Sequence, residues 1–183
     1  MIDLKNKICL VTGSNGYLGK SIIKKLKRYG AIVIETDIKN KKSINKKIFF
    51  IKADISKGKD INKLFKIVSK KHKKIDILVN NAGYVANDKK SNKIFYDKKY
   101  LEVNLSGAIN LIEKFLPLLN KSKSSSIINI GSIYGFLAYD KNLYVGTKMI
   151  SPIAYGISKG ALIQSTKLLA SKFAPKIRVN AIS

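Results

Sequence analysis

Short apolar runs alternate along the chain with segments in which apolar residues recur every three or four positions. Runs of the first kind are typical of buried strands, and the spacing of the second kind is typical of helices with one apolar face. Strands are predicted at residues 7–12, 31–36, 48–52, 75–80, 126–130 and 177–181. Helices are predicted at residues 21–29, 60–71, 96–120 and 154–173. This alternation predicts an α/β fold, a parallel sheet with helices on both faces.

One domain accommodates all of these elements. The chain has 183 residues, 45% of them apolar, which is enough for one core, and we find no internal repeat or linker. No apolar run is long enough to span a bilayer, and the start, Met-Ile-Asp-Leu-Lys, lacks a secretory leader. The single cysteine, Cys9, cannot form an internal disulfide and is expected in the core. We expect one cytoplasmic domain over residues 1–183.

The charge balance is strongly basic, with 36 Lys and Arg against 11 Asp and Glu and a formal net charge of +25. Such a balance raises nucleic acid or a membrane surface as partners. The lysines are spread over every predicted helix and loop, however, and no aromatic residues interleave with them. We therefore expect no specific nucleic-acid partner and no membrane, only nonspecific attraction of anions at low salt. His72, in a lysine run, is expected to face solvent, and we find no metal-ligand cluster.

The first predicted strand leads into a glycine-rich turn, Thr12-Gly-Ser-Asn-Gly-Tyr-Leu-Gly19. Positions without a side chain let the backbone approach a pyrophosphate, whose charge is met by the N–H groups that begin the next helix. Asp37, at the end of the second strand, can accept hydrogen bonds from a ribose diol and would repel a 2′-phosphate. The pattern predicts a site for NAD, and the alternative for Asp37 is a solvated turn residue. The predicted cofactor-binding residues of the turn are Gly13, Ser14, Asn15, Gly16, Tyr17, Leu18 and Gly19.

A tyrosine and a lysine four residues apart, Tyr155 and Lys159, are expected on one face of the last predicted helix. A neighbouring ammonium favours the phenolate, so Tyr155 could exchange a proton with a substrate oxygen nearer neutral pH. Taken alone, the pair also fits an ordinary packed helix. A second match, Tyr144 with Lys148, is soon followed by Pro152, which interrupts a helix. We therefore assign the pair at 155 and 159.

The ordered set of motifs resembles the short-chain dehydrogenase/reductase family over the whole chain. The matching segments are the glycine turn, Asp54 in Ala-Asp-Ile, Asn80-Asn-Ala-Gly83, Asn104 in Val-Asn-Leu, Ser132 in Ile-Asn-Ile-Gly-Ser, Tyr155 with Lys159, and the closing Ile177-Arg-Val-Asn-Ala-Ile-Ser. The resemblance implies a doubly wound sheet of the Rossmann type, with NAD as cofactor.

The resemblance also implies a catalytic tetrad of Asn104, Ser132, Tyr155 and Lys159. Ser132 would hold the substrate oxygen and Tyr155 would pass the proton. Lys159 would bind the nicotinamide ribose and lower the tyrosine pKa, and Asn104 would support a proton-relay water. As alternatives, Asn104 caps or kinks its helix and Ser132 is a turn residue. Further cofactor contacts implied by the resemblance are Asp54 and Ile55 at the adenine, with Asn81, Ala82, Gly83, Tyr155 and Lys159 along the cofactor.

The sequence departs from the family pattern in three places. The glycine spacing resembles the extended, sugar-nucleotide branch, whereas Asn-Asn-Ala-Gly points to the simple branch. The segment from Gly135 to Pro152 is longer than the resemblance leads us to expect, would sit beside the substrate, and looks like a subgroup associated with flagellin modification and surface-sugar synthesis. The chain also stops at Ser183, where members continue into a substrate lid and a seventh strand. The resemblance thus implies a truncated domain or a fragment, with the sixth strand left as an exposed edge.

The leading functional prediction is an NAD(H)-dependent oxidoreductase that interconverts a secondary alcohol and a ketone. A sugar or sugar phosphate is the expected substrate, and the resemblance implies a homo-oligomer, dimer or tetramer, formed through the helices that begin near Tyr96 and Ala154. One alternative is an epimerase or dehydratase of nucleotide sugars, which uses the same tyrosine and cofactor. A second alternative is an inactive cofactor-binding or assembly module.

Overall fold

The strands form one parallel sheet in the order β3-β2-β1-β4-β5-β6. The computed structural model describes residues 3–40, 49–86, 98–138, 140, 142, 145–146 and 152–183. The strands are β1 (Ile8–Thr12), β2 (Ile32–Asp37), β3 (Phe49–Lys52), β4 (Ile77–Asn80), β5 (Ser125–Ile130) and β6 (Ile177–Ile182). All neighbouring strands pair in parallel, which confirms the predicted sheet.

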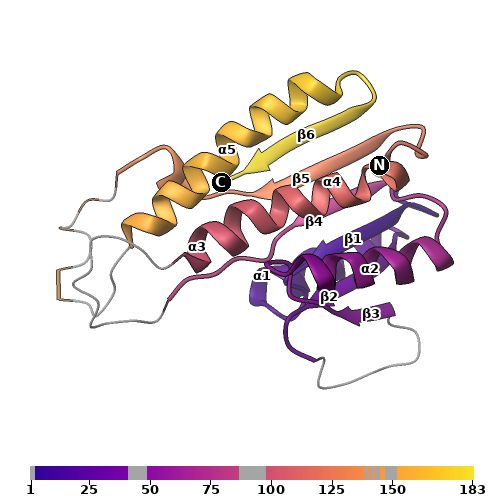
Figure 1. The fold of residues 1–183 in the computed structure, drawn as a ribbon, viewed down its shortest axis with the longest axis horizontal. Coiled ribbons are helices and arrows are strands. Elements are labelled where there is room, and N and C mark those ends of the chain that lie inside the picture. The colour runs from indigo at the N-terminus through magenta and orange to yellow at the C-terminus, as the bar shows by residue number, and fades with distance from the viewer. Residues whose placement is uncertain are drawn as a thin grey trace.

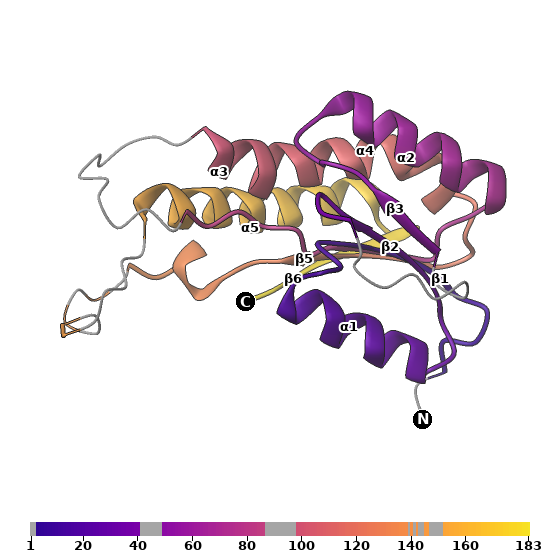
Figure 2. The same cartoon turned by 90° about the horizontal axis from the view of Figure 1, so that it is seen from below.

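Helices cover both faces of this sheet. They are α1 (Tyr17–Arg28), α2 (Gly58–Lys71), α3 (Lys99–Leu101), α4 (Ala108–Leu119) and α5 (Ile153–Phe173), with a π-turn η1 (Glu102–Gly107) and a 3₁₀ turn η2 (Ile133–Gly135). Figure 2 shows α2, α4 and α5 on one face and α1 on the other. The helix predicted over 96–120 is present from Lys99 onward, but η1 interrupts it. Residues 96 and 97 lie outside the described residues.

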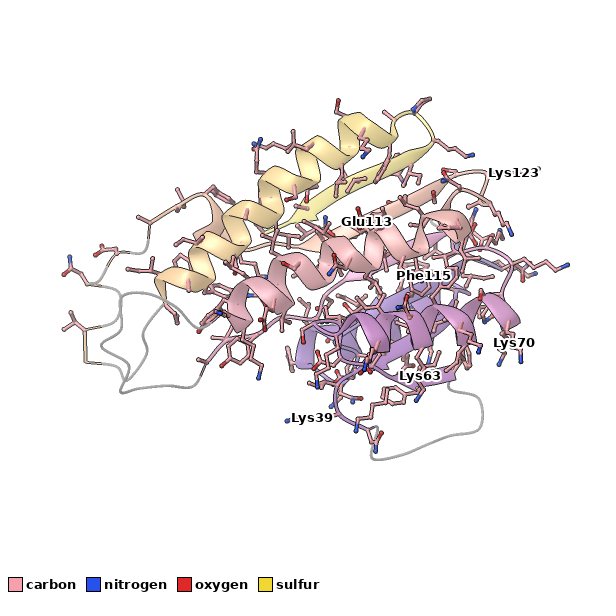
Figure 3. The ribbon with its side chains drawn as sticks, viewed as in Figure 1. Lys39, Lys63, Lys70, Glu113, Phe115 and Lys123 are labelled. Atoms are coloured by element: carbon pink, nitrogen blue, oxygen red, sulfur yellow. The ribbon has the colours of Figure 1, made fainter. Side chains whose placement is uncertain are left out.

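The two faces of the sheet bury alternate residues of each strand. On β1, Ile8 and Leu10 face the larger core under α2 and α4, whereas Cys9 and Val11 face the smaller core under α1. A strand buried on both faces is apolar at most positions, and this is why the residues from Ile8 to Val11 read as a continuous apolar run. Phe115 of α4 lies in the larger core and is labelled in Figure 3.

Two small expectations on single side chains had different outcomes. Cys9 is fully buried as predicted, and burial raises the pKa of its thiol to about 12. His72 does not simply face solvent: it is half-buried, its ring lies 5.7 Å from that of Phe49, and burial is the main reason that its pKa is lowered. The prediction was wrong because a cationic sequence neighbourhood does not reveal which residues the ring packs against.

Lysines come from several elements of the fold. Of the four labelled in Figure 3, Lys39 follows β2, Lys63 and Lys70 lie on α2, and Lys123 precedes β5. Within the described residues, no group of three or more His, Cys, Asp or Glu side chains could hold a metal ion. Across the same ranges, no helix is both long and apolar enough to cross a membrane.

The strand order places a crevice at the carboxyl ends of β1 and β4. The chain moves outward from β1 to β2 and β3, and in the opposite direction from β4 to β5 and β6 (Figure 1). In a parallel sheet the segments that leave two such strands diverge, and ligands bind between them. The glycine turn follows β1 and the Asn-Asn-Ala-Gly segment follows β4, so the fold brings these two motifs together.

Candidate active site

The glycine turn packs directly against the start of α1. Gly13 has φ +63°, and a Cβ atom on it would lie 2.8 Å from Cα of Ala82. A Cβ atom on Gly19 would overlap the carbonyl oxygen of Gly13. The turn can therefore reach this compact form only without side chains at these two positions.

Gly19→Ala is expected to destabilise the protein by about 1–3 kcal/mol, because the added methyl pushes α1 away from the turn. Affinity for the dinucleotide that the sequence predicts at this turn should fall at least about tenfold, since the N–H groups at the start of α1 move from their places. Urea denaturation and fluorescence titration with NADH measure the two effects. The matched control is Gly58→Ala at the start of α2, where a Cβ atom meets nothing within 4 Å. Equal behaviour of the two variants would contradict the close packing inferred for the turn.

A hollow of about 450 Å³ lies over the turn and reaches α5. The structure brings most of the predicted site residues into its lining, and places Ser14, Asp54, Ile55, Asn104 and Ser132 outside it. Four lining residues were not predicted: Lys39, Val85, Ile130 and Gly131. The predicted residues that line it are Gly13, Asn15, Gly16, Tyr17, Leu18, Gly19, Asp37, Asn81, Ala82, Gly83, Tyr155 and Lys159.

The carboxylate of Asp37 is held in the wall of this hollow by two backbone N–H groups. Asn15 donates to one oxygen at 2.9 Å and Lys39 donates to the other at 3.0 Å. The side-chain amide of Asn15 also donates to the carbonyl oxygen of Lys39 at 2.8 Å. Each carboxylate oxygen has a second lone pair, so Asp37 can still accept hydrogen bonds from a ligand.

The segment after β4 is joined to the glycine turn by side-chain hydrogen bonds. The Thr12 hydroxyl accepts from the backbone N–H groups of Asn81 (3.0 Å) and Ala82 (2.9 Å). The Asn81 amide donates to the carbonyl oxygens of Thr12 (2.9 Å) and Gly13 (3.1 Å). The two walls of the crevice are thus fixed relative to each other.

Three residues implied at the adenine or in the glycine turn make mainly internal contacts. The Asp54 carboxylate accepts from the backbone N–H (3.0 Å) and hydroxyl (2.7 Å) of Ser56, ahead of α2. Ile55 is buried, and its carbonyl oxygen lies where a Cβ atom on Gly107 would reach within 2.9 Å. Ser14 is also buried, and its backbone N–H donates to the carbonyl oxygen of Thr36 at 3.1 Å.

The side chain of Asn104 joins three segments. It lies in η1 and is 2% exposed. Its carbonyl oxygen accepts from the Tyr84 N–H at 2.6 Å, and its amide donates to the Tyr84 carbonyl (3.1 Å) and the Ser158 hydroxyl (3.0 Å). These bonds occupy both hydrogens of the amide, so a relay water held by Asn104 would contact its backbone or the remaining lone pair of its side-chain oxygen.

Ser132 is the N-cap residue immediately before η2, and its hydroxyl oxygen accepts from the Tyr134 N–H at 3.2 Å. The hydroxyl proton is still available to a substrate oxygen. The turn packs tightly on α5, because Cβ atoms on Gly156 and Gly160 would lie 3.0 Å and 2.9 Å from carbonyl oxygens of η2. These small residues keep the turn that follows Ser132 close to the part of α5 that carries Tyr155 and Lys159.

Tyr155 and Lys159 lie on one helix, as predicted, and both line the hollow. The helix begins just after Pro152, and the competing pair, Tyr144 and Lys148, lies outside the described residues. Lys159 is only 4% exposed, and its Nζ donates to the carbonyl oxygen of Ile130 at 2.6 Å. Nζ lies 5.8 Å from the centroid of the Tyr155 ring. Burial lowers the pKa of Lys159 to about 8.

A buried chain of hydrogen bonds anchors α5 to the sheet. Asn80 of β4 donates to Asn129 of β5 at 2.8 Å, and Asn129 donates to the Thr166 hydroxyl of α5 at 2.9 Å. Thr166 in turn donates to the carbonyl oxygen of Leu162 at 2.8 Å. All three polar side chains are at most 5% exposed. The side-chain oxygen of Asn80 is buried without a partner, but the bonds between the three side chains favour one arrangement and hold α5 against the central strands.

Curated relatives align with nearly the whole of this chain. A 3-oxoacyl-[acyl-carrier-protein] reductase, FabG, from Aquifex aeolicus is 31% identical, covering 100% of this chain and 74% of the relative. An NAD-dependent glycerol dehydrogenase from Listeria innocua is 30% identical, over 99% of this chain and 70% of the relative. Post-translational flagellin modification protein A from Campylobacter coli is 30% identical, over 98% of this chain and 77% of the relative.

Solved structures share the fold and differ in the cofactor named. A short chain dehydrogenase from Leptospira borgpetersenii with bound NAD⁺ is 31% identical, with a TM-score of 0.86 over 99% of this chain and 71% of that one. RhlG from Pseudomonas aeruginosa, in a complex with NADP, is 27% identical, with a TM-score of 0.82 over 99% of this chain and 73% of that one. The family model described as short chain dehydrogenase matches residues 7–183. The protein therefore belongs to the short-chain dehydrogenase/reductase family of oxidoreductases, the family that the ordered motifs predicted.

Proposed function

We propose that this chain holds NAD(H) and interconverts a secondary alcohol and a ketone. The observation that carries the proposal is the single hollow that has the glycine turn and Asp37 in its lining together with Tyr155 and Lys159. A dinucleotide needs a site that extends over both motifs, because the ribose of its adenosine half lies far from its reactive nicotinamide ring.

The residues present fit the cofactor. The glycine turn offers backbone surface without side chains, and the N–H groups at the start of α1 suit a pyrophosphate. Asp37 suits the hydroxyl groups of a ribose, and the buried ammonium of Lys159 suits those of the second ribose. Bound NAD(H) supplies the acceptor or donor of a hydride.

The protein residues would then handle the proton and the developing charge. The Tyr155 phenol donates a proton to the ketone oxygen in reduction, and its phenolate takes the proton back in oxidation. The Ser132 hydroxyl donates a hydrogen bond to the same substrate oxygen. The Lys159 ammonium stabilises the negative charge that forms on the Tyr155 oxygen when it releases its proton.

We extend the proposal to sugars, sugar phosphates or related polyols as substrates. The names of a glycerol dehydrogenase and a flagellin modification protein among the relatives support it. The net charge of +25 supports attraction of a phosphorylated substrate. The resemblance implies that the segment from Gly135 to Pro152 sits beside the substrate, and most of residues 139–151 within it lie outside the described residues.

The test is to supply the full-length protein with polyols, aldoses, sugar phosphates and nucleotide sugars, each with NAD or NADP. Formation of NADH, followed by absorbance, supports the dehydrogenase. Isomerised or dehydrated nucleotide sugars without net NADH, identified by NMR, would replace it with the epimerase or dehydratase. NADH binding without conversion of any of these compounds would support the alternative of an inactive cofactor-binding module.

Asp37 should make NAD bind more tightly than NADP by about tenfold or more, because a carboxylate repels a 2′-phosphate in a partly desolvated site. Asp37→Asn removes the charge and should reduce this preference. Lys39 lines the same hollow and attracts the phosphate, so Lys39→Ala should increase the preference. Titration calorimetry with both cofactors measures the ratio, and Asp3→Asn, at a distant exposed turn, is the control. Equal affinities in the unmodified protein would rule out the role given to Asp37.

We also propose a cytoplasmic homo-oligomer formed through α4 and α5. On α5, Ile157 and Leu168 are 49% and 63% exposed. Eleven residues are close to three helical turns, so both side chains lie on one face. These two exposed apolar side chains support contact with a second copy.

A further inference from the structure

Three tyrosine rings meet where α3, α5 and the segment after β4 come together. The Tyr100 ring of α3 lies 5.0 Å from the Tyr84 ring and 6.4 Å from the Tyr155 ring, between centroids, with edge-on geometry in both pairs. Tyr100 is 3% exposed. Edge-on pairs at these distances attract each other, so Tyr100 links the segment after β4 to the residue that we propose as proton donor.

The Tyr100 hydroxyl makes a second link to the same segment. It accepts a hydrogen bond from the backbone N–H of Ala86 at 2.9 Å. Asn104, one helical turn further along, binds both backbone groups of Tyr84. Two side chains of one helical stretch thus hold alternate residues of the segment that lines the hollow.

The residue between these two attachment points is Val85. This residue is 57% exposed and lines the hollow, as Tyr155 and Lys159 also do. Without the Tyr100 hydroxyl the peptide of Ala86 loses its partner, and Val85 is then fixed from one side only. Without the Tyr100 ring, the ring of Tyr155 also loses a neighbour.

We propose that Tyr100 is a positioning residue for the reaction. It holds the wall at Val85 with its hydroxyl and the ring of Tyr155 with its own ring, so that both keep one placement relative to the cofactor. This inference rests on the proposed function, because it assumes that Tyr155 transfers the proton. A tyrosine that only fills the core would support the stability of the fold and nothing else.

Two substitutions separate the contributions of the hydroxyl and the ring. Tyr100→Phe keeps the ring, and should weaken NADH binding by about threefold to tenfold while leaving the midpoint of thermal unfolding nearly unchanged. Tyr100→Leu removes both contributions and should in addition lower kcat by about tenfold. Tyr29→Phe, at the end of α1 and remote from the hollow, is the control and should change none of these values.

The environment of Tyr155 can be read without any substrate. In protein labelled with ¹³C at the ζ carbon of tyrosine, the Tyr155 signal is identified by its disappearance in Tyr155→Phe. We expect this signal to shift and broaden in Tyr100→Leu, and to shift less in Tyr100→Phe.

The outcomes distinguish this inference from the proposed function. If neither variant alters NADH affinity or the Tyr155 signal, Tyr100 only fills the core and the inference is wrong. If the unmodified protein binds no NADH, the proposed function fails, and the Tyr155 signal alone decides on the positioning role. If Tyr100→Leu does not fold, Tyr100→Phe decides, because a threefold loss of affinity at unchanged stability is not expected of a core residue.

Discussion

Replacing Tyr155 by phenylalanine should lower kcat about a hundredfold or more in the full-length protein. The variant keeps the ring and its contact with Tyr100, and loses only the group that gives and takes the proton. NADH binding should stay within about twofold, because the glycine turn and Asp37 are untouched. Stopped-flow kinetics and fluorescence titration measure the two quantities.

The same measurement on Tyr144→Phe is the natural comparison. Tyr144 is the competing tyrosine of the sequence and lies outside the described residues. Its loss should mainly raise the KM of the substrate. If Tyr144→Phe reduced kcat more than Tyr155→Phe, the proton donor would be on the other motif and the assignment of α5 as the catalytic helix would be wrong.

Lys159→Met should combine a large loss of turnover with a gain in stability. The ammonium is expected to bind the ribose and stabilise the phenolate of Tyr155, so kcat should fall about a hundredfold. Burial has lowered the lysine pKa from 10.5 to about 8, which corresponds to a penalty of about 3 kcal/mol for carrying the charge at neutral pH. The variant removes this penalty but leaves the Ile130 carbonyl without its donor, which offsets about 1 kcal/mol. Without cofactor, the free energy of unfolding at pH 7 should rise by about 1–2 kcal/mol.

The sign of this gain depends on pH. Between pH 8 and 10.5 the unfolded chain holds a proton on Lys159 that the folded protein has released, so the stability of the unmodified protein rises with pH in this window. The advantage of the variant should be complete below pH 8 and disappear above pH 10.5. Lys167→Met, at an exposed position of the same helix, is the control and should show no such dependence. Urea denaturation of both proteins at a series of pH values measures this dependence. If Lys159→Met were less stable than the unmodified protein at pH 7, the inferred cost of burying the Lys159 charge would be wrong.

The sequence predicted the sheet well because its strands are buried on both faces. The run from Ile8 to Val11 has no polar position, which is typical of a central strand of a parallel sheet. The helix containing Asn104 was predicted in extent but not in form. Its π-turn brings the Asn104 side chain to the backbone of Tyr84, and the spacing of apolar residues carries no information on such a change in backbone bonding.

The candidate site was predicted where a motif follows a strand. Those residues could be assigned to one place because parallel strands direct their carboxyl ends to one edge of the sheet. Tyr100, Val85 and the carbonyl of Ile130 were missed, since each matters through a partner that is distant in the sequence. The burial of Lys159 could not be predicted from the sequence either, because lysine side chains are ordinarily exposed and this chain has many of them.

The buried chain formed by Asn80, Asn129 and Thr166 has a consequence for how the protein opens. Separating α5 from the sheet would expose three polar side chains at once and break both bonds that connect them. A partial separation would break the same hydrogen bonds and would therefore cost nearly as much free energy as a complete one. The middle of α5 and the ends of β4 and β5 should thus open together as one cooperative unit. In hydrogen exchange, their amide protons would share a single opening free energy, whereas those of α1 on the opposite face would exchange independently.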